Sequence, residues 1–221
     1  MWPDATVTVG EAFTNGARLI AANKAATVTA SAIWFISAMM TAASNFAMPV
    51  IAQYLLLLGG LFGSFIGTGI LGRYTILSAA QSQPTTRHAI TFEQTAARFT
   101  VTSFVIALAG VIVMVIGVAL TGGNPAAVKF VGIPAVLIAV LAVLAPYNSA
   151  LGAPLGTAIT NSFRAITAPR IAVTAFVAVC MIGLSMTIPI LGLLLMPWQS
   201  AALAYLRFHD PSAKQAASIA D

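Results

Sequence analysis

Side chains that could carry chemistry are few in this chain, and they lie outside its long apolar stretches. Its carboxylates and histidines are Asp4, Glu11, Glu93, Asp210, Asp221, His88 and His209. Membrane enzymes and proton-coupled carriers need ionisable groups at bilayer depth, where such groups are costly and usually mark function. Ser185 falls short of a serine-nucleophile motif, and no histidine inside an apolar run could activate it. This inventory predicts a protein that is not an enzyme.

The sequence also lacks the patterns typical of metal and cofactor sites. Cys180 is the single cysteine and lies in an apolar run, so it can form neither an intrachain disulfide nor a thiol metal cluster. The chain has no HExxH motif, no P-loop and no glycine-rich dinucleotide motif. We therefore predict no metal and no cofactor, and we interpret Cys180 as a small packing residue.

Two short motifs are the best candidates for a solute site. Pro146-Tyr147-Asn148 and Pro197-Trp198-Gln199 each combine a proline, an aromatic ring and an amide. A proline inside a helix frees a backbone carbonyl and can open a polar pocket at depth, as in transporters with broken helices. The candidate pocket residues are Tyr147, Asn148, Trp198 and Gln199. The alternative is a packing kink in which the amide satisfies the freed backbone.

A row of glycines marks the second apolar stretch. Gly59, Gly63 and Gly67 recur every four residues, and small residues at this spacing let helices approach closely. The row is therefore a predicted helix-packing seam. Its partner is a helix of the same bundle or, alternatively, a second copy of the chain in a homo-oligomer.

Membrane-spanning helices must position these residues. Hydrophobic residues make up 59% of the chain and charged residues 7%, whereas soluble domains carry about 25% charged residues. This predicts an all-α polytopic bundle with one membrane domain over residues 1–221. The predicted spans cover residues 25–45, 49–72, 99–120, 128–147, 171–187 and 189–206. We interpret Pro49, Pro134 and Pro189 as the openings of the even-numbered spans.

A repeated segment organises these spans. Residues 10–24, GEAFTNGARLIAANK, align without a gap with residues 156–170, GTAITNSFRAITAPR. Each copy is predicted to be an amphipathic leader helix at the membrane surface, with Arg18 or Arg164 opposite its apolar face. The predicted apolar faces are Phe13, Ala17 and Ile20, and Ile159, Phe163 and Ile166. A weaker third leader near Thr91 completes predicted repeat units at 9–72, 90–147 and 155–207.

Basic residues predict the orientation. Of the ten lysines and arginines, Lys129 alone falls on the second side of the six-span arrangement. The positive-inside bias therefore places both termini and the leader helices in the cytoplasm. The net charge of +5 suits anionic lipid headgroups, and we expect no nucleic-acid binding. Arg18 and Arg164 are candidate contacts for headgroups or for a protein partner, the alternative being anchoring alone.

The ending MPWQSAALAYLRFHD, together with the leader and hairpin pattern, resembles a loose group of uncharacterised six-span prokaryotic membrane proteins. The membrane domain of some glycerophosphodiester phosphodiesterases is similar. In that group the last span often runs from a proline to an aromatic-Arg, aromatic-Asp end, matched here by Pro197, Tyr205, Arg207 and Asp210. The resemblance implies this fold and a bacterial or archaeal cell membrane. No catalytic domain accompanies it, so it implies no phosphodiesterase activity.

Two functions fit these observations. The first is a non-enzymatic membrane protein that supports or regulates the cell envelope by binding lipid or a protein partner. The second is a small-solute transporter, or the membrane subunit of one, which would use the candidate pocket. A water-accessible cavity between the fourth and sixth spans would favour the transporter, and a solid apolar interior would favour the first function.

Overall fold

The computed structural model describes residues 6–44, 46, 49–81, 92–122 and 124–218. Within these ranges all regular secondary structure is helical, in agreement with the predicted all-α class. The helices are α1 (Val9–Ala22), α2 (Lys24–Ala43), α3 (Val50–Gln81), α4 (Phe92–Leu120), α5 (Pro125–Ala142), α6 (Ala145–Ala150), α7 (Leu155–Ile166), α8 (Pro169–Thr187), α9 (Pro189–His209) and α10 (Pro211–Ser218).

Several helices have the length and apolar composition needed to cross a membrane. Five segments qualify: Lys24–Ala43, Val50–Ala79, Thr95–Leu120, Phe130–Ala150 and Pro189–His209. Helices α7 and α8 are bent by 113° at the break between them, and they add a sixth candidate if the pair counts as one span. The described residues therefore contain five or six helices of span length, close to the six that the sequence predicts.

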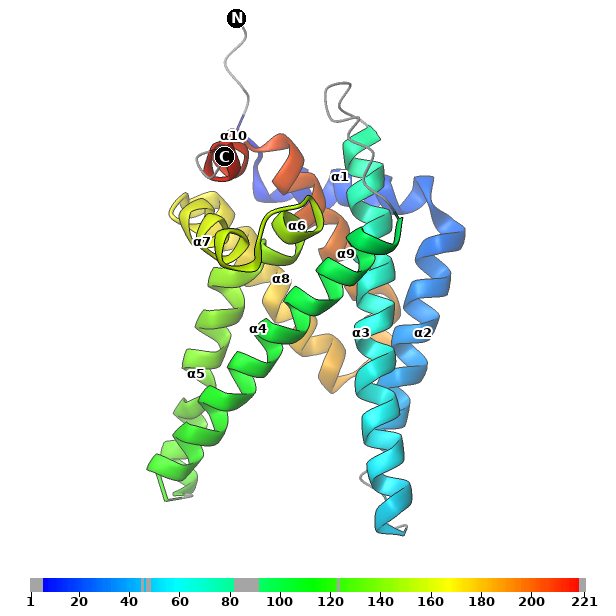
Figure 1. Ribbon diagram of the computed structural model, residues 1–221, viewed down its shortest axis with the longest axis vertical. Coiled ribbons are helices and arrows are strands. Elements are labelled where there is room, and N and C mark those ends of the chain that lie inside the picture. The colour runs from blue at the N-terminus through cyan, green and yellow to red at the C-terminus, as the bar shows by residue number, and fades with distance from the viewer. Residues whose placement is uncertain (1–5, 45, 47–48, 82–91, 123, 219–221) are drawn as a thin grey trace, which may run out of the picture.

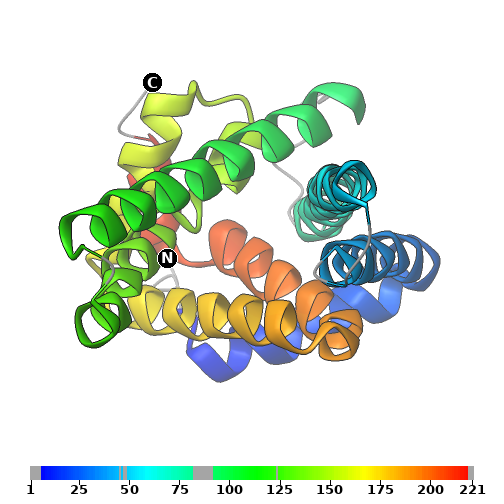
Figure 2. The ribbon, with the colours of Figure 1, turned by 90° about the horizontal axis from the view of Figure 1, so that it is seen from below.

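Three helical hairpins form the body of the molecule: α2 with α3, α4 with α5, and α8 with α9 (Figure 1). Helices α1, α7 and α10 lie at one end, named here the terminal end. The turns of the first two hairpins lie at the opposite end, named the hairpin end (Figure 1). The first two hairpins diverge toward the hairpin end. Seen from that end, α2 and α3 point along the view, whereas α4 and α8 cross it obliquely (Figure 2).

Helix α9 is the central element, because it contacts α1, α2, α3, α8 and α10. Most of its second half is buried, and three of its alanines, Ala201, Ala202 and Ala204, have no exposed surface. Small side chains let neighbouring helices approach closely. Near the start of α9, a Cβ atom on Gly192 would overlap the indole ring of Trp34 from α2. The position of α9 therefore depends on close contact with several helices at once.

The predicted glycine row lies against α2 within the first hairpin. A Cβ atom on Gly59 would lie 2.8 Å from the methyl group of Met40, and one on Gly67 would lie 3.1 Å from the carbonyl oxygen of Ala30. The atoms nearest to Gly63 belong to the side chain of Ser37. The row therefore packs inside the chain, as the first of the two sequence interpretations has it, and it is covered by α2.

Helix α1 packs on α9 through two small residues outside the apolar face expected from the sequence, together with Phe13 of that face. Ala12 and Gly16 are buried, and a Cβ atom on Gly16 would lie 2.7 Å from the backbone nitrogen of Ala202. Ala17, which belongs to the expected apolar face, is exposed. The predicted face was wrong at Ala17, and the closest contact falls on Ala12 and Gly16 because two helix backbones can approach this closely only where their side chains are small.

Helix α7 shows the same kind of difference. Its buried residues are Ala158, Asn161, Ser162, Ala165 and Ile166. Phe163 was expected on the apolar face but is 43% exposed, whereas Asn161, which is not part of that face, is buried. The hydroxyl of Ser162 donates to the carbonyl of Leu141 at 2.7 Å and accepts from the N–H of Leu144 at 3.1 Å. Polar side chains face inward here because the end of α5 needs hydrogen-bond partners.

Several helix boundaries also differ from the sequence prediction. Helix α3 continues to Gln81, well past Gly72, where the ring of Phe99 packs against the glycine. Helix α4 runs unbroken from Phe92, so the expected third leader forms the first turns of the same helix as the span. Pro134 lies inside α5 rather than opening it, and Pro125 is the first residue of that helix. A proline thus marks a helix start only when the preceding residues cannot continue the helix.

Candidate functional site

A cavity of about 270 Å³ lies where the three hairpins meet. Its walls come from α3, α4, α5, α6, α8 and α9 and from the link between α5 and α6. Most of the lining is apolar, including Ile106, Ala107, Ala135, Ala139, Val179 and Ile182. The cavity lies between the predicted fourth and sixth spans, the place where a water-accessible cavity would favour a transporter. The presence of a cavity is a feature expected of the transporter, whereas its mainly apolar walls are a feature expected of the non-enzymatic membrane protein.

Tyr147 lines the cavity with its hydrogen bonds already made inside the protein. Its hydroxyl donates to the carbonyl oxygen of Ser200 at 3.0 Å and lies 3.1 Å from the Ser200 hydroxyl. The Ser200 hydroxyl lies 3.3 Å from that of Thr75, so the contacts join α6, α9 and α3. The ring packs edge-on against Phe99, with 5.0 Å between centroids. Tyr147 therefore holds three helices together, and its hydroxyl is not free for a solute.

Gln199 is the polar residue of the cavity wall with unused hydrogen-bonding capacity. Its side chain is 5% exposed, and its amide oxygen has no hydrogen-bond partner among the described residues. Its amide nitrogen lies 4.0 Å from the sulfur of Met196, which is a weak acceptor. Thr68 and Ser103 also line the cavity, but their hydroxyls donate to backbone carbonyls four residues earlier. Gln199 therefore offers an amide to whatever occupies the cavity.

Asn148, the next residue after Tyr147, does not line the cavity. Its side-chain nitrogen donates to the carbonyl of Ala158 in α7 at 3.4 Å, and its side-chain oxygen accepts from the Nε of Arg207 in α9. Because both ends of the amide are used, Asn148 connects α6 with α7 and α9. Its side chain is 4% exposed, so these contacts form within the terminal end.

Trp198, the last of the predicted pocket residues, faces α1. Its indole N–H donates to the carbonyl of Phe13 at 2.8 Å, and the two rings pack edge to face with 5.8 Å between centroids. Of the four predicted residues, the structure thus brings Tyr147 and Gln199 to one cavity. It places Asn148 and Trp198 in separate contacts between helices.

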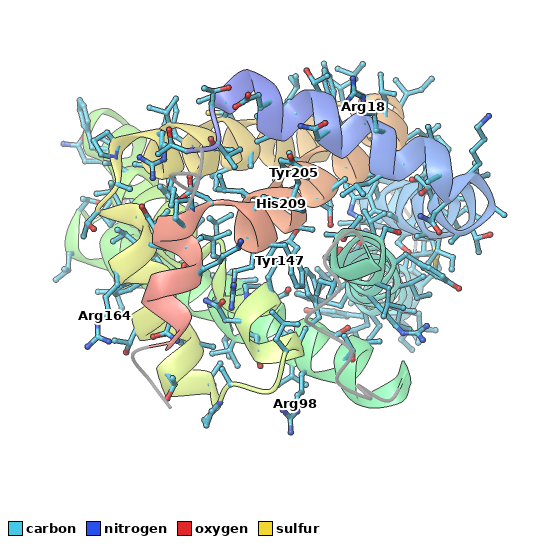
Figure 3. The ribbon with its side chains drawn as sticks, turned by 90° about the horizontal axis from the view of Figure 1, so that it is seen from above. Arg18, Arg98, Tyr147, Arg164, Tyr205 and His209 are labelled. Atoms are coloured by element: carbon cyan, nitrogen blue, oxygen red, sulfur yellow. The ribbon has the colours of Figure 1, made fainter. Side chains whose placement is uncertain are left out.

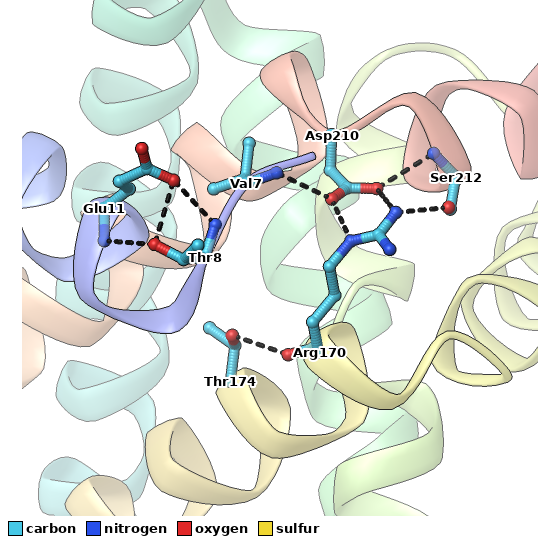
Figure 4. Close-up of polar contacts among 7 residues, drawn as sticks. All are labelled: Val7, Thr8, Glu11, Arg170, Thr174, Asp210 and Ser212. Carbon is cyan, nitrogen blue, oxygen red and sulfur yellow. Dashed lines mark hydrogen bonds and ion pairs between the residues drawn. The ribbon is translucent and has the colours of Figure 1, made fainter. Parts of the chain in front are cut away.

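Asp210 joins three parts of the terminal end (Figure 4). Its carboxylate accepts hydrogen bonds from the Nε of Arg170 at 2.8 Å and from the Nη2 at 3.2 Å. It also accepts from the backbone N–H groups of Val7 at 3.3 Å and Ser212 at 2.9 Å. Burial raises the pKa of this carboxyl, but the hydrogen bonds from Arg170 outweigh burial and hold the pKa below its usual value. All its acceptor positions serve the fold.

The predicted headgroup residues Arg18 and Arg164 are both exposed at the edge of the terminal end, where they point outward together with Arg98 (Figure 3). Arg18 donates to the side-chain oxygen of Asn15 at 3.1 Å, one turn earlier in α1. Their exposure suits contact with headgroups or with a partner, and the sequence alternative of anchoring alone stays open.

Sequence reasoning did not find the pairing of Arg170 with Asp210. The two residues are 40 positions apart, and each stood in a different motif, the repeated segment and the chain ending. One local signal was available, because Asp210 followed by Pro211 is a typical start of a helix, here α10. The arginine partner has no such local signal.

The described residues contain no group of three or more His, Cys, Asp and Glu side chains placed to hold a metal ion. Comparison of the chain with protein-family models, with curated proteins and with solved structures finds no match.

Proposed function

We propose that this chain is a multi-pass protein of the cell membrane that binds lipid through the cavity between its hairpins and has no enzymatic activity. The apolar cavity of about 270 Å³ carries this proposal. Pockets for complete small ligands measure roughly 300–1,000 Å³, so this space suits a section of one acyl chain. A polar solute would lose its hydration against these walls with little in return, whereas a hydrocarbon chain would not.

The outer surface supports a membrane location. Leu58 in α3, Ile112 in α4 and Leu137 in α5 are each about half exposed, and they belong to a large set of outward-facing apolar side chains. Exposed apolar area of this extent is unusual in a soluble protein, where it would face water. In a bilayer the same side chains face hydrocarbon, while the helices satisfy their own backbone hydrogen bonds.

The basic residues support an orientation with the terminal end in the cytoplasm. Arg18, Arg98, Arg164, Arg170, Arg207 and Lys214 belong to the terminal end. Lys129 belongs to the first turn of α5, at the hairpin end. This asymmetry follows the positive-inside bias. Exposed bases at that end also suit anionic lipid headgroups or an acidic protein partner.

Cysteine labelling tests this orientation on a Cys180→Ala background. Thr121→Cys lies at the hairpin end, and Thr167→Cys lies at the terminal end. In intact cells, an impermeant maleimide should label Thr121→Cys and should reach Thr167→Cys only after the membrane is permeabilised. The reverse pattern would turn the proposed orientation around.

Equivalent burial of α1 and α7 supports the proposed repeat of leader helices. In the gap-free alignment, Ala12 corresponds to Ala158 and Gly16 to Ser162, and all four residues are buried. The aligned Arg18 and Arg164 are both exposed. The two helices thus turn the same register inward although they pack on different neighbours. From the resemblance to six-span prokaryotic membrane proteins we infer this fold and no activity.

The proposal of a non-enzymatic protein is supported by the contacts of the remaining nucleophile and base candidates. The Ser185 hydroxyl is buried and donates to the carbonyl of Met181 at 2.7 Å. His209 stacks on Tyr205 with 4.1 Å between ring centroids, and its Nδ1 lies 3.0 Å from the Tyr205 carbonyl. A nucleophile and a general base must lie within hydrogen-bond reach of each other, which these two residues do not.

A small-solute transporter is the alternative, and the Gln199 amide favours it. A buried amide without a partner costs about 1–3 kcal/mol, and a solute with a hydroxyl or carbonyl group would recover part of that. We favour lipid because the other polar groups in the wall are already bonded.

Photolabelling tests the lipid proposal directly. A phosphatidylcholine carrying a diazirine in the middle of one acyl chain is added to the purified protein, and labelled peptides are found by mass spectrometry. We expect label on residues 103–110, which contribute much of the α4 wall. Ala139→Phe should fill the cavity and abolish this label. Leu137→Phe is the matched control, since Leu137 is 55% exposed on the same helix.

Equal labelling of residues 103–110 in wild type and Ala139→Phe would contradict the proposal, because the label would then come from lipid outside the bundle. Loss of label in Leu137→Phe as well would contradict it too, since that variant leaves the cavity open.

A further inference from the structure

Arg207 lies within the terminal end without a carboxylate partner. It projects from the last turns of α9, is only partly exposed, and donates from its Nε to the side-chain oxygen of Asn148. A guanidinium carries five N–H donors, and no other hydrogen bond links the Arg207 side chain to the described residues. Its two terminal nitrogens therefore have no protein acceptor in the described part of the chain.

The described carboxylates at this end are already used. Asp210 is paired with Arg170, which is the only ion pair within the described residues. Glu11 accepts hydrogen bonds from the backbone N–H and the hydroxyl of Thr8 at the start of α1. Arg170 and Arg207 thus belong to the same end of the molecule, but among the described residues only Arg170 has a counter-charge.

The position of Asn148 indicates that the guanidinium is held in place. The Asn148 nitrogen is tied to the Ala158 carbonyl of α7, which directs its oxygen toward Arg207. Since only the Nε is used, the two terminal nitrogens of Arg207 keep their hydrogen-bonding capacity among the described residues. Enclosure strengthens the attraction between a charge and its counter-ion, because the local dielectric is lower than that of water. A held, partly enclosed cation of this kind favours an anion from outside the chain.

We propose that Arg207 and Asn148 form a binding site for an oxyanion, a phosphate or carboxylate group that the terminal nitrogens of Arg207 clasp. A planar guanidinium matches such a group with two parallel hydrogen bonds. The last turns of α9, with Tyr205 and His209, lie near the middle of the terminal end, and Arg18, Arg98 and Arg164 surround them (Figure 3). This ring of bases draws anions toward the site.

The oxyanion site is distinct from the apolar cavity. Leu203 and Tyr147 line the cavity. Arg207 lies one helical turn beyond Leu203 and does not line it. The anion can be the headgroup of an anionic lipid or a free anion, since both present the same oxygens. Inorganic phosphate has no acyl chain, so a response to this probe does not depend on the acyl-chain proposal.

Thermal unfolding of the purified full chain tests the site with two probes. The first probe is inorganic phosphate, compared with chloride at equal ionic strength. The second is a nanodisc of phosphatidylcholine with phosphatidylglycerol, compared with phosphatidylcholine alone. We expect both probes to raise the unfolding temperature of the wild type and of Arg164→Gln, the matched control that removes an exposed arginine at the same end.

Arg207→Gln should weaken the apparent phosphate affinity by about tenfold or more, as expected for a lost charge-assisted hydrogen bond. Arg207→Lys should keep part of the response, because it keeps the charge but loses the planar fork. If Arg207→Gln does not fold, Asn148→Asp serves instead. It loses the hydrogen bond to the Ala158 carbonyl but places a carboxylate against Arg207, and this ion pair should let the variant fold without phosphate and no longer respond to it.

A response to both probes supports the oxyanion site, and a response to phosphatidylglycerol alone supports it with a lipid headgroup as the anion. The proposal is overturned if the wild type responds to neither probe. It is also overturned if Arg207→Gln, or Asn148→Asp where it replaces that variant, responds as strongly as the wild type.

Discussion

Replacing Asp210 with alanine should destabilise the terminal end, because the change removes the acceptor of four hydrogen bonds. The donors are the Nε and Nη2 of Arg170 and the backbone N–H groups of Val7 and Ser212. Arg170 would keep its charge, with the Ser212 hydroxyl at 2.8 Å as its remaining polar contact. The variant therefore leaves a cation and two N–H groups without their partner.

The expected loss follows from how deeply the pair is buried. Removing one partner of a fully buried ion pair costs about 3–5 kcal/mol. The Arg170 side chain is 31% exposed, so water can solvate part of the freed charge, and we expect a loss of about 2–3 kcal/mol. Equilibrium unfolding by dodecyl sulfate in mixed micelles, followed by circular dichroism, measures it. Glu11→Ala is the control, and this exposed cap should cost markedly less.

A double-mutant cycle decides whether the pair acts as a unit. Asp210→Ala and Arg170→Ala remove the same contact, so together they should cost less than the sum of the two separate losses. If the two losses add within about 0.5 kcal/mol, the two residues do not stabilise each other and the reasoning is wrong. The same holds if Asp210→Ala costs no more than Glu11→Ala.

The remaining predictions concern packing and pH, and the same unfolding assay measures them. Gly16→Ala should cost about 1–3 kcal/mol, because its methyl group meets the α9 backbone at 2.7 Å, whereas Gly10→Ala has open space and should be neutral or slightly stabilising. Equal effects at the two glycines would refute the close approach of α1 to α9. Gly63→Leu should destabilise the first hairpin more than Gly132→Leu, where a Cβ atom meets nothing within 4 Å. No difference between them would remove the seam. The pKa of Asp210 is below its usual value, so its contribution is complete above about pH 3.9 and is lost as pH falls through the lower folded-state pKa. Wild type should therefore lose more stability than Asp210→Asn on acidification, and parallel losses would contradict this.

The spans could be predicted from the sequence because apolar composition is a local property. The predicted first, fifth and sixth spans lie close to α2, α8 and α9. The glycine row was also visible, since its spacing of four matches one face of a helix. The full lengths of α3 and α4 could not be predicted, because nothing local forces a helix to end at the membrane boundary. Gly72 and Thr95 both continue their helices past the predicted limits.

The candidate site could be predicted only in part, and helix geometry explains why. Neighbouring residues on a helix point about 100° apart, so the side chains of one short motif are readily directed to different neighbours. Tyr147 and Gln199 line the cavity, whereas Asn148 and Trp198 are directed to α7 with α9 and to α1. The oxyanion site could not be predicted, because tertiary contacts decide that Asp210 pairs with Arg170 and not with Arg207.

The docking of α1 on α9 sets an order for making the protein. Helix α1 leaves the ribosome well before α9, on which it packs, and the N–H of Val7 bonds to a carboxylate 203 residues later. At about 5–20 residues per second, translation separates the two by roughly 10–40 s. During that interval the small-residue face around Gly16 has no partner. A nascent chain that stops before α9 therefore exposes an undocked α1, and such a segment is a preferred site for proteases that remove incomplete products.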